Sequence, residues 1–108
     1  MNKYEEELGN CVKFVEQEDG KKSATVTPGY GCSATVGFNP FYPMSVTLAD
    51  ACINRRNVKH EFTHLLGFMH EHTRKDRGKN LEIMFENIYS SCKKGFYMKS
   101  LMYPNSLW

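Results

Sequence analysis

The chain has 108 residues, of which 41% are hydrophobic and 24% are charged, and its formal net charge is +2. This composition is that of an ordinary globular protein and excludes a disordered tail or a fibrous repeat. Basic residues are interleaved with acidic ones and are expected on solvated faces, as at residues 74–77. This distribution argues against nucleic-acid binding. The longest apolar run, residues 65–69, is far shorter than the roughly 20 residues of a membrane span.

One helix-forming stretch and four strand-forming stretches precede the histidine-rich part of the chain. Residues 3–8 are helix-prone. Short β-branched and aromatic runs, separated by Gly- and Pro-containing turns, then predict about four strands. These expected strands cover residues 11–16, 23–27, 31–38 and 44–49.

The four cysteines lie far apart, and none forms the C-x-x-C pair of a zinc ribbon or redox motif. Such spacing favours disulfide bonds, which form in secreted proteins. The N-terminal stretch MNKYEEELGN lacks the basic start and apolar core of a secretory signal. We therefore expect the chain to be part of a longer secreted precursor. The alternative is that the cysteines are free thiols in a reducing compartment.

Residues 57–68 carry apolar side chains at three- and four-residue steps, which is typical of an amphipathic helix. Asn57 is a suitable residue to cap the start of this helix. Gly67 is where the helix can end most easily, because glycine adopts the left-handed backbone conformation that closes a helix.

All four histidines of the chain lie in the stretch 60–72. His60 and His64 are one helical turn apart, so both imidazoles leave the same face and can bind one ion together. Once the helix has ended at Gly67, the chain can return and bring His70 in as a third ligand. We expect His72 to be a surface neighbour, the alternative being a substitute ligand.

Three imidazoles and one open position are the arrangement of a catalytic zinc ion, because structural zinc sites fill four positions with protein ligands. A zinc ion so held makes a water molecule acidic enough to act as a nucleophile near neutral pH. Glu61 directly follows the first histidine and can reach that water without being a ligand. The pattern therefore predicts hydrolytic chemistry with Glu61 as general base.

The segments HEFTHLLGFMHE and HTRKDR resemble the zinc signature of the astacin family of metzincin metalloproteases. The upstream segments CVKFVEQED, GYGCSATVG and VTLADACI resemble the strands and cysteines that precede the zinc helix in that family. The resemblance implies an α+β fold: a metzincin-like N-terminal subdomain with a small mixed, twisted sheet of about four strands packed on the zinc-binding helix. The C-terminal subdomain would be largely missing, so residues 1–108 would form one partial peptidase domain.

Metzincins close the metal site with a methionine turn, which the resemblance places at about residues 100–104, SLMYP, with Met102. In astacins a tyrosine of this turn binds zinc and moves to the transition state. If one residue is deleted here, Tyr103 takes that place; without a gap, Pro104 occupies it. The family's glutamate that pairs with the buried mature N-terminus would be Glu71, and we expect it to be unpaired in a chain that begins at Met1.

The resemblance also assigns cysteines. Cys32 and Cys52 match a disulfide that brackets the strands before the zinc helix. Cys11 matches a cysteine whose usual partner lies in the missing C-terminal part. Either Cys92 replaces that partner, or Cys11 and Cys92 are unpaired thiols.

The function implied by the resemblance is that of a secreted zinc endopeptidase with one Zn²⁺ per chain and a polypeptide substrate. The substrate would lie extended along an edge strand formed by Ser33, Ala34, Thr35, Val36 and Gly37, pairing through its backbone. The alternative is a zinc-binding remnant without proteolytic activity that binds peptides or partner proteins.

Overall fold

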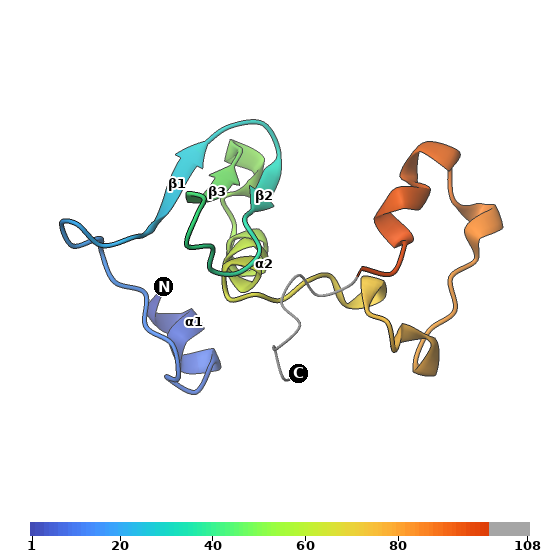
Figure 1. The fold of residues 1–108 in the computed structure, drawn as a ribbon, viewed down its shortest axis with the longest axis horizontal. Coiled ribbons are helices and arrows are strands. Elements are labelled where there is room, and N and C mark those ends of the chain that lie inside the picture. The colour runs from blue at the N-terminus through green and yellow to red at the C-terminus, as the bar shows by residue number, and fades with distance from the viewer. Residues whose placement is uncertain (100–108) are drawn as a thin grey trace. The chain divides into compact units, whose positions relative to one another are not determined.

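The computed structural model describes residues 1–99. The expected methionine turn, with Met102 and Tyr103, lies outside these residues. The chain divides into two units, Met1–Phe68 and Met69–Trp108, which are drawn in Figure 1. Within residues 1–99 the helices are all too short or too polar to span a membrane.

The first unit contains a sheet of three strands, β1 (Ala24–Pro28), β2 (Cys32–Ala34) and β3 (Met44–Leu48). Their order is β1-β3-β2, with β3 in the centre (Figure 1). Strand β3 runs parallel to β1 and antiparallel to β2. The expected α+β class and mixed sheet are therefore present, and β2 lies at an edge of the sheet.

The fourth expected strand, over residues 11–16, does not form. This segment packs instead against helices. The Phe14 ring stacks on Tyr4 of helix α1 (Asn2–Glu7) with centroids 5.8 Å apart, and meets Phe62 edge-on at 5.3 Å. The Phe14 N–H donates to the Glu5 carboxylate at 2.6 Å, so the backbone group that a sheet would use is already paired with a side chain.

The core of the first unit lies between the central strand and helix α2 (Arg55–Leu65). Val46 is fully buried, and Leu48 and Cys52 are nearly so. Val58, Phe62 and Leu65 of α2 pack against this cluster. These apolar contacts fix the helix on one face of the sheet, because burial of apolar surface is the main stabilising term in a small domain.

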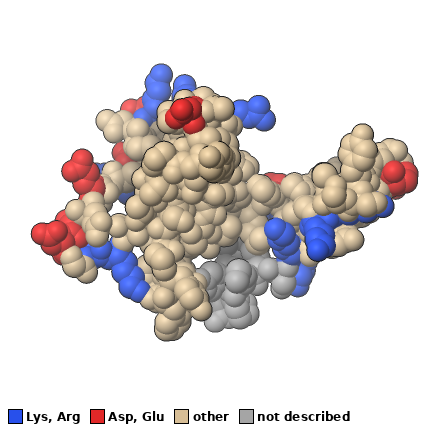
Figure 2. All heavy atoms as spheres, turned by 90° about the horizontal axis from the view of Figure 1, so that it is seen from above, with Lys and Arg blue, Asp and Glu red and all other residues tan. Residues whose placement is uncertain are grey.

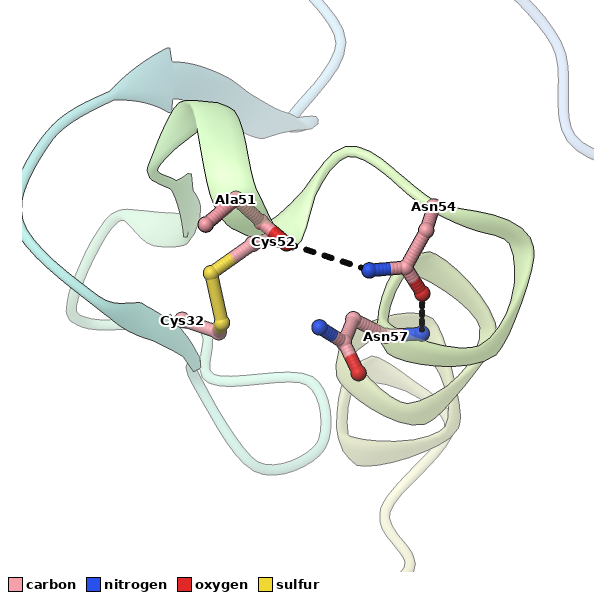
Figure 3. Close-up of a disulfide and its surroundings, with 5 residues drawn as sticks. All are labelled: Cys32, Ala51, Cys52, Asn54 and Asn57. Atoms are coloured by element: carbon pink, nitrogen blue, oxygen red, sulfur yellow. Dashed lines mark hydrogen bonds between the residues drawn. A yellow bond between two sulfur atoms is a disulfide. The ribbon is translucent and has the colours of Figure 1, made fainter.

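Helix α2 begins and ends earlier than residues 57–68, and its N-cap is Asn54 rather than Asn57. Asn54 has an extended backbone, and its side-chain oxygen accepts the N–H of Asn57 at 3.0 Å (Figure 3). Asn57 is thus the third helical residue, whose N–H would otherwise lack a partner. At the other end the helix stops at Leu65, two residues before Gly67.

A disulfide joins Cys32 of β2 to Cys52 of the 3-10 helix η1 (Asp50–Cys52), which leads into α2 (Figure 3). The Asn54 amide also donates to the Ala51 carbonyl at 3.1 Å, as the same view shows. The disulfide and the cap together hold the start of α2 beside the edge strand. Cys11 and Cys92 are free and exposed.

The second unit is built from short 3-10 helices joined by irregular backbone. Among residues 69–99, two polar side chains are buried: Thr73 is 1% exposed and Arg77 is 8% exposed. The expectation of a solvated basic cluster at residues 74–77 is therefore wrong for Arg77. The helices are η2 (Glu71–Thr73), η3 (Arg77–Lys79), η4 (Phe85–Asn87) and η5 (Ser90–Phe96).

The charged side chains seen in Figure 2 occur in small groups of either sign around a broad uncharged area. Several large apolar side chains contribute to the exposed surface. The most exposed of them are Tyr30, Phe41 and Tyr89.

Candidate metal centre

Helix α2 presents His60 and His64 on one face, as their four-residue spacing requires. Their Nε2 atoms lie 3.2 Å apart, and their rings meet edge-on with centroids 4.7 Å apart. His64 is buried, whereas His60 is exposed. The two imidazoles thus point their Nε2 atoms at a common position.

The other ring nitrogen of His64, Nδ1, lies 2.7 Å from the carbonyl oxygen of Phe68. A carbonyl oxygen only accepts hydrogen bonds, so Nδ1 is the donor, and Nε2 is the ring nitrogen left to face a metal ion. Metal-binding histidines are usually oriented in this way by a carbonyl or carboxylate acceptor. The turn after α2 therefore fixes the His64 ring with its Nε2 toward His60.

Gly67 has a φ of 98°, a left-handed conformation that glycine adopts without steric cost. The carbonyl oxygen of His64 accepts two hydrogen bonds, each of 2.8 Å, from the N–H groups of Gly67 and Gly37. The first closes the helix, and the second ties the segment after β2 to the helix end. Gly37 was expected only as part of an edge strand, and its bond to His64 joins residues too far apart in sequence for local patterns to predict.

Among residues 1–99, His60, His64 and His70 form a group that could hold a metal ion. One ligand atom from each lies within 4.8 Å of the other two. Two nitrogens that bind a tetrahedral zinc ion at about 2.0–2.1 Å are about 3.3 Å apart. The 3.2 Å between the Nε2 atoms of His60 and His64 fits this requirement. A set of three neutral imidazoles is also the donor chemistry that zinc prefers.

Glu61 lies next to His60 in α2 and is 5% exposed. A carboxylate is rarely so buried without a specific role or partner.

His72 has a different environment from the other three histidines, because its Nε2 lies 2.9 Å from the carbonyl oxygen of Gly95. It does not belong to the three-histidine group that the described residues form.

Glu71 is exposed and forms an ion pair with Arg74, whose Nε lies 3.5 Å from the Glu71 carboxylate. It is thus not the unpaired residue that was expected. Arg74 also donates two hydrogen bonds to Asp76, at 2.9 and 3.1 Å. These bonds lower the pKa of Asp76 and, with the charges of Asp76 and Glu71, raise the pKa of Arg74.

The expected substrate strand is only partly a strand: Ser33 and Ala34 belong to β2, and residues 35–37 continue it without regular pairing. The N–H of Thr35 donates to the Ser45 carbonyl at 2.9 Å. Because backbone groups alternate in direction along a strand, those of Ala34 point away from β3. This edge of the sheet can therefore pair with another extended chain. Tyr103 lies outside the described residues.

Comparison with known proteins adds to this geometry. The sequence profile of the Astacin peptidase family matches residues 1–106. The chain is 33% identical over 86 residues to low choriolytic enzyme of Oryzias latipes, covering 80% of this chain and 32% of that protein. It is 30% identical over 86 residues to astacin-like metalloendopeptidase of Coturnix japonica, covering 80% of this chain and 21% of that protein.

A solved structure is also similar: high choriolytic enzyme 1, a hatching enzyme zinc-protease from Oryzias latipes, superposes with a TM-score of 0.74 at 27% identity. The match covers 83% of this chain and 45% of that one. The chain thus spans less than half the length of these relatives. The histidine group, the sheet and the sequence profile agree, and the chain belongs to the astacin family of peptidases.

Proposed function

We propose that this chain is the zinc-binding part of a secreted endopeptidase that hydrolyses peptide bonds. The observation that carries the proposal is that ligand atoms of His60, His64 and His70 lie close to one another. Glu61, which directly follows His60, is buried. We propose that the three histidines hold one Zn²⁺ per chain. Secretion is supported by the Cys32–Cys52 disulfide, since such bonds persist in oxidising compartments.

In this proposal each side chain has one task. A zinc ion held by His60, His64 and His70 would supply Lewis acidity toward a peptide carbonyl and a water molecule. Glu61 accepts the proton of the attacking water and delivers it to the departing amine. The bond from His64 Nδ1 to the Phe68 carbonyl keeps the His64 ring in its ligand orientation throughout.

The substrate, we propose, is a polypeptide in extended conformation beside residues 33–37. The outward backbone groups of Ala34, and the backbone of the segment that follows it, would pair with the substrate antiparallel, which gives affinity without side-chain selection. Residues 1–108 would be part of a larger peptidase domain, and the 45% coverage of the related solved structure supports this part of the proposal. We also propose that the Tyr103 phenol contributes to the transition state; Tyr103 lies outside the residues that the structure describes.

Zinc content and proteolysis of the 108-residue chain test the proposal together. We expect Glu61→Gln to retain one zinc ion and to lose cleavage of an unfolded protein by a factor of about 100 or more, the range of general-base catalysis. Glu82→Gln, at an exposed glutamate, is the matched control and should leave both unchanged. Undiminished cleavage by the Glu61 variant would remove the proposed base.

A second candidate is a zinc-binding module that binds peptides without cleaving them. The position of β2 at an edge of the sheet that residues 1–99 form favours it, because backbone pairing needs no catalytic chemistry. Tight zinc and peptide binding without turnover, in a longer form of the protein that includes the flanking sequence, would select this candidate over the peptidase.

A further inference from the structure

In the second unit, the ring of His72 lies against two other rings. It stacks on His70 with centroids 5.5 Å apart and an angle of 16° between the planes. Phe96 packs at 5.1 Å from it with a tilt of 47°. The Nε2 of His72 lies 2.9 Å from the Gly95 carbonyl oxygen, to which it must donate a proton because the carbonyl only accepts. His72 is thus fixed by one hydrogen bond and two ring contacts.

The backbone of the same turn is also held by side chains. Both the N–H and the hydroxyl of Thr73 donate to the His70 carbonyl, at 2.9 and 2.7 Å. Arg77 donates from Nη1 to the carbonyls of His72, at 2.8 Å, and Phe96. Since Thr73 and Arg77 are buried, these bonds exchange little with water and hold the turn in one conformation.

The His70 side chain is exposed, and the ring of His72 lies against it. An exposed imidazole loses rotamer freedom when it binds a metal, and this loss weakens binding unless the ring is oriented beforehand. The nearly parallel ring of His72 provides such an orientation. His72 also does not compete for the metal through Nε2, which is bonded to Gly95.

We propose that His72 is a positioning residue for the third metal ligand: its ring, anchored on Gly95 and Phe96, holds the His70 imidazole in the orientation that binds the ion. This inference rests on the proposed function, because it takes the histidine group to be the metal site. It assigns a role to His72, the fourth histidine of the chain, which is not in the three-histidine group.

The test is the zinc affinity of the 108-residue chain, measured by competition with a chromogenic chelator. We compare His72→Phe, which keeps a flat ring, with His72→Gln, which keeps a donor for the Gly95 carbonyl but has no ring. We expect the Gln variant to bind zinc about 10-fold or more weakly, the range found when partners of ligating histidines are removed, and the Phe variant to stay within about threefold of wild type. Tyr89→Ala, at an exposed ring in the same unit, should bind as wild type does.

A spectroscopic measurement separates positioning from general stability. The visible spectrum of bound Co²⁺ reports its coordination, and the ring-proton shifts of His70 in the metal-free protein report the stacking. We expect both to change in the Gln variant and to be nearly retained in the Phe variant. Wild-type zinc affinity in the Gln variant, or equal weakening in both variants, would contradict the role of His72 but not the proposed function. A wild-type chain that binds no zinc would overturn the proposed function and this inference with it.

Discussion

The hydroxyl groups of Tyr4 and Thr63 form a hydrogen bond of 2.5 Å that joins α1 to α2. Thr63 donates its single hydroxyl proton to the Lys59 carbonyl at 2.7 Å, so the Tyr4 hydroxyl must be the donor to Thr63. Tyr4 is buried and stacks on Phe14. The N-terminal helix is thereby attached to the helix that carries two of the three histidines.

Removing the Tyr4 hydroxyl should weaken this attachment. We expect Tyr4→Phe to lower the free energy of unfolding by about 1 kcal/mol, the net value of one hydrogen bond. Thr63→Val should cost more, roughly 1–3 kcal/mol, because it leaves the buried Tyr4 donor without an acceptor. Chemical denaturation measures both, with the exposed Tyr30→Phe as the neutral control. Equal stability of the Tyr4 and Tyr30 variants would contradict the assignment of the bond.

The left-handed conformation of Gly67 predicts a second effect. We expect Gly67→Ala to destabilise the fold by about 1–2 kcal/mol, since an L-residue is strained in this region. An added Cβ would lie 4.0 Å from Gly37 Cα, an ordinary contact, so the cost is conformational rather than steric. Gly78→Ala meets open space, and φ at Gly78 is not in the left-handed region, so it should be nearly neutral. Thermal unfolding of both variants decides the matter, and identical midpoints would refute the prediction.

Loss of the Cys32–Cys52 disulfide should be the largest single change. The bond links residues 20 positions apart, and a loop of that size corresponds to about 3 kcal/mol of stabilisation. We expect the double variant Cys32→Ala, Cys52→Ala to unfold at correspondingly lower denaturant concentration. The double variant Cys11→Ala, Cys92→Ala removes two exposed free thiols and should behave as wild type. A loss in the second variant as large as in the first would show that the thiols are paired in solution.

The ion pairs of Glu7 predict a pH dependence of stability. Hydrogen bonds from Lys59 and then Arg55 lower the pKa of Glu7 below its ordinary value of 4.5. A carboxyl with a lowered pKa in the folded state stabilises the fold above its ordinary pKa, and this contribution disappears as the pH falls through the folded value. Wild type should therefore melt at a higher temperature than Glu7→Gln at neutral pH.

The difference should be small, because the pairs are exposed and screened by salt. It should vanish in acid, below the folded pKa of Glu7. Glu16→Gln removes the same charge from an exposed position in the irregular segment and is the matched control. A wild-type advantage that persists unchanged in acid would rule out Glu7 as its source.

Local patterns predicted the histidine region well. The spacing of His60 and His64 and the glycine at 67 depend only on helix geometry and on the conformational freedom of one residue, and both are seen in the structure. The bond from His64 to the Phe68 carbonyl is equally local but was not predicted, because it depends on how the turn after Gly67 is oriented.

Other features depend on partners far away in the chain. The alternation at residues 11–16 reads as a strand, yet it cannot tell whether the partner is a sheet or, as for Phe14, the rings of Tyr4 and Phe62. The cap was expected at Asn57, but the N-cap is Asn54, where the extended backbone begins the helix three positions earlier than that residue. Burial of Arg77 was missed because its acceptors are backbone carbonyls, which leave no trace in the pattern of charges.

The two hydrogen bonds on the His64 carbonyl have a mechanical consequence. Through Gly37 the segment after the edge strand shares an anchor with the end of α2, so a displacement of either is transmitted to the other. A peptide that binds along residues 33–37 and shifts this segment would therefore also displace the turn after α2 that contains Gly67. Binding of a peptide at the β2 edge would in this way affect the orientation of His64, because both depend on the hydrogen bonds of the His64 carbonyl.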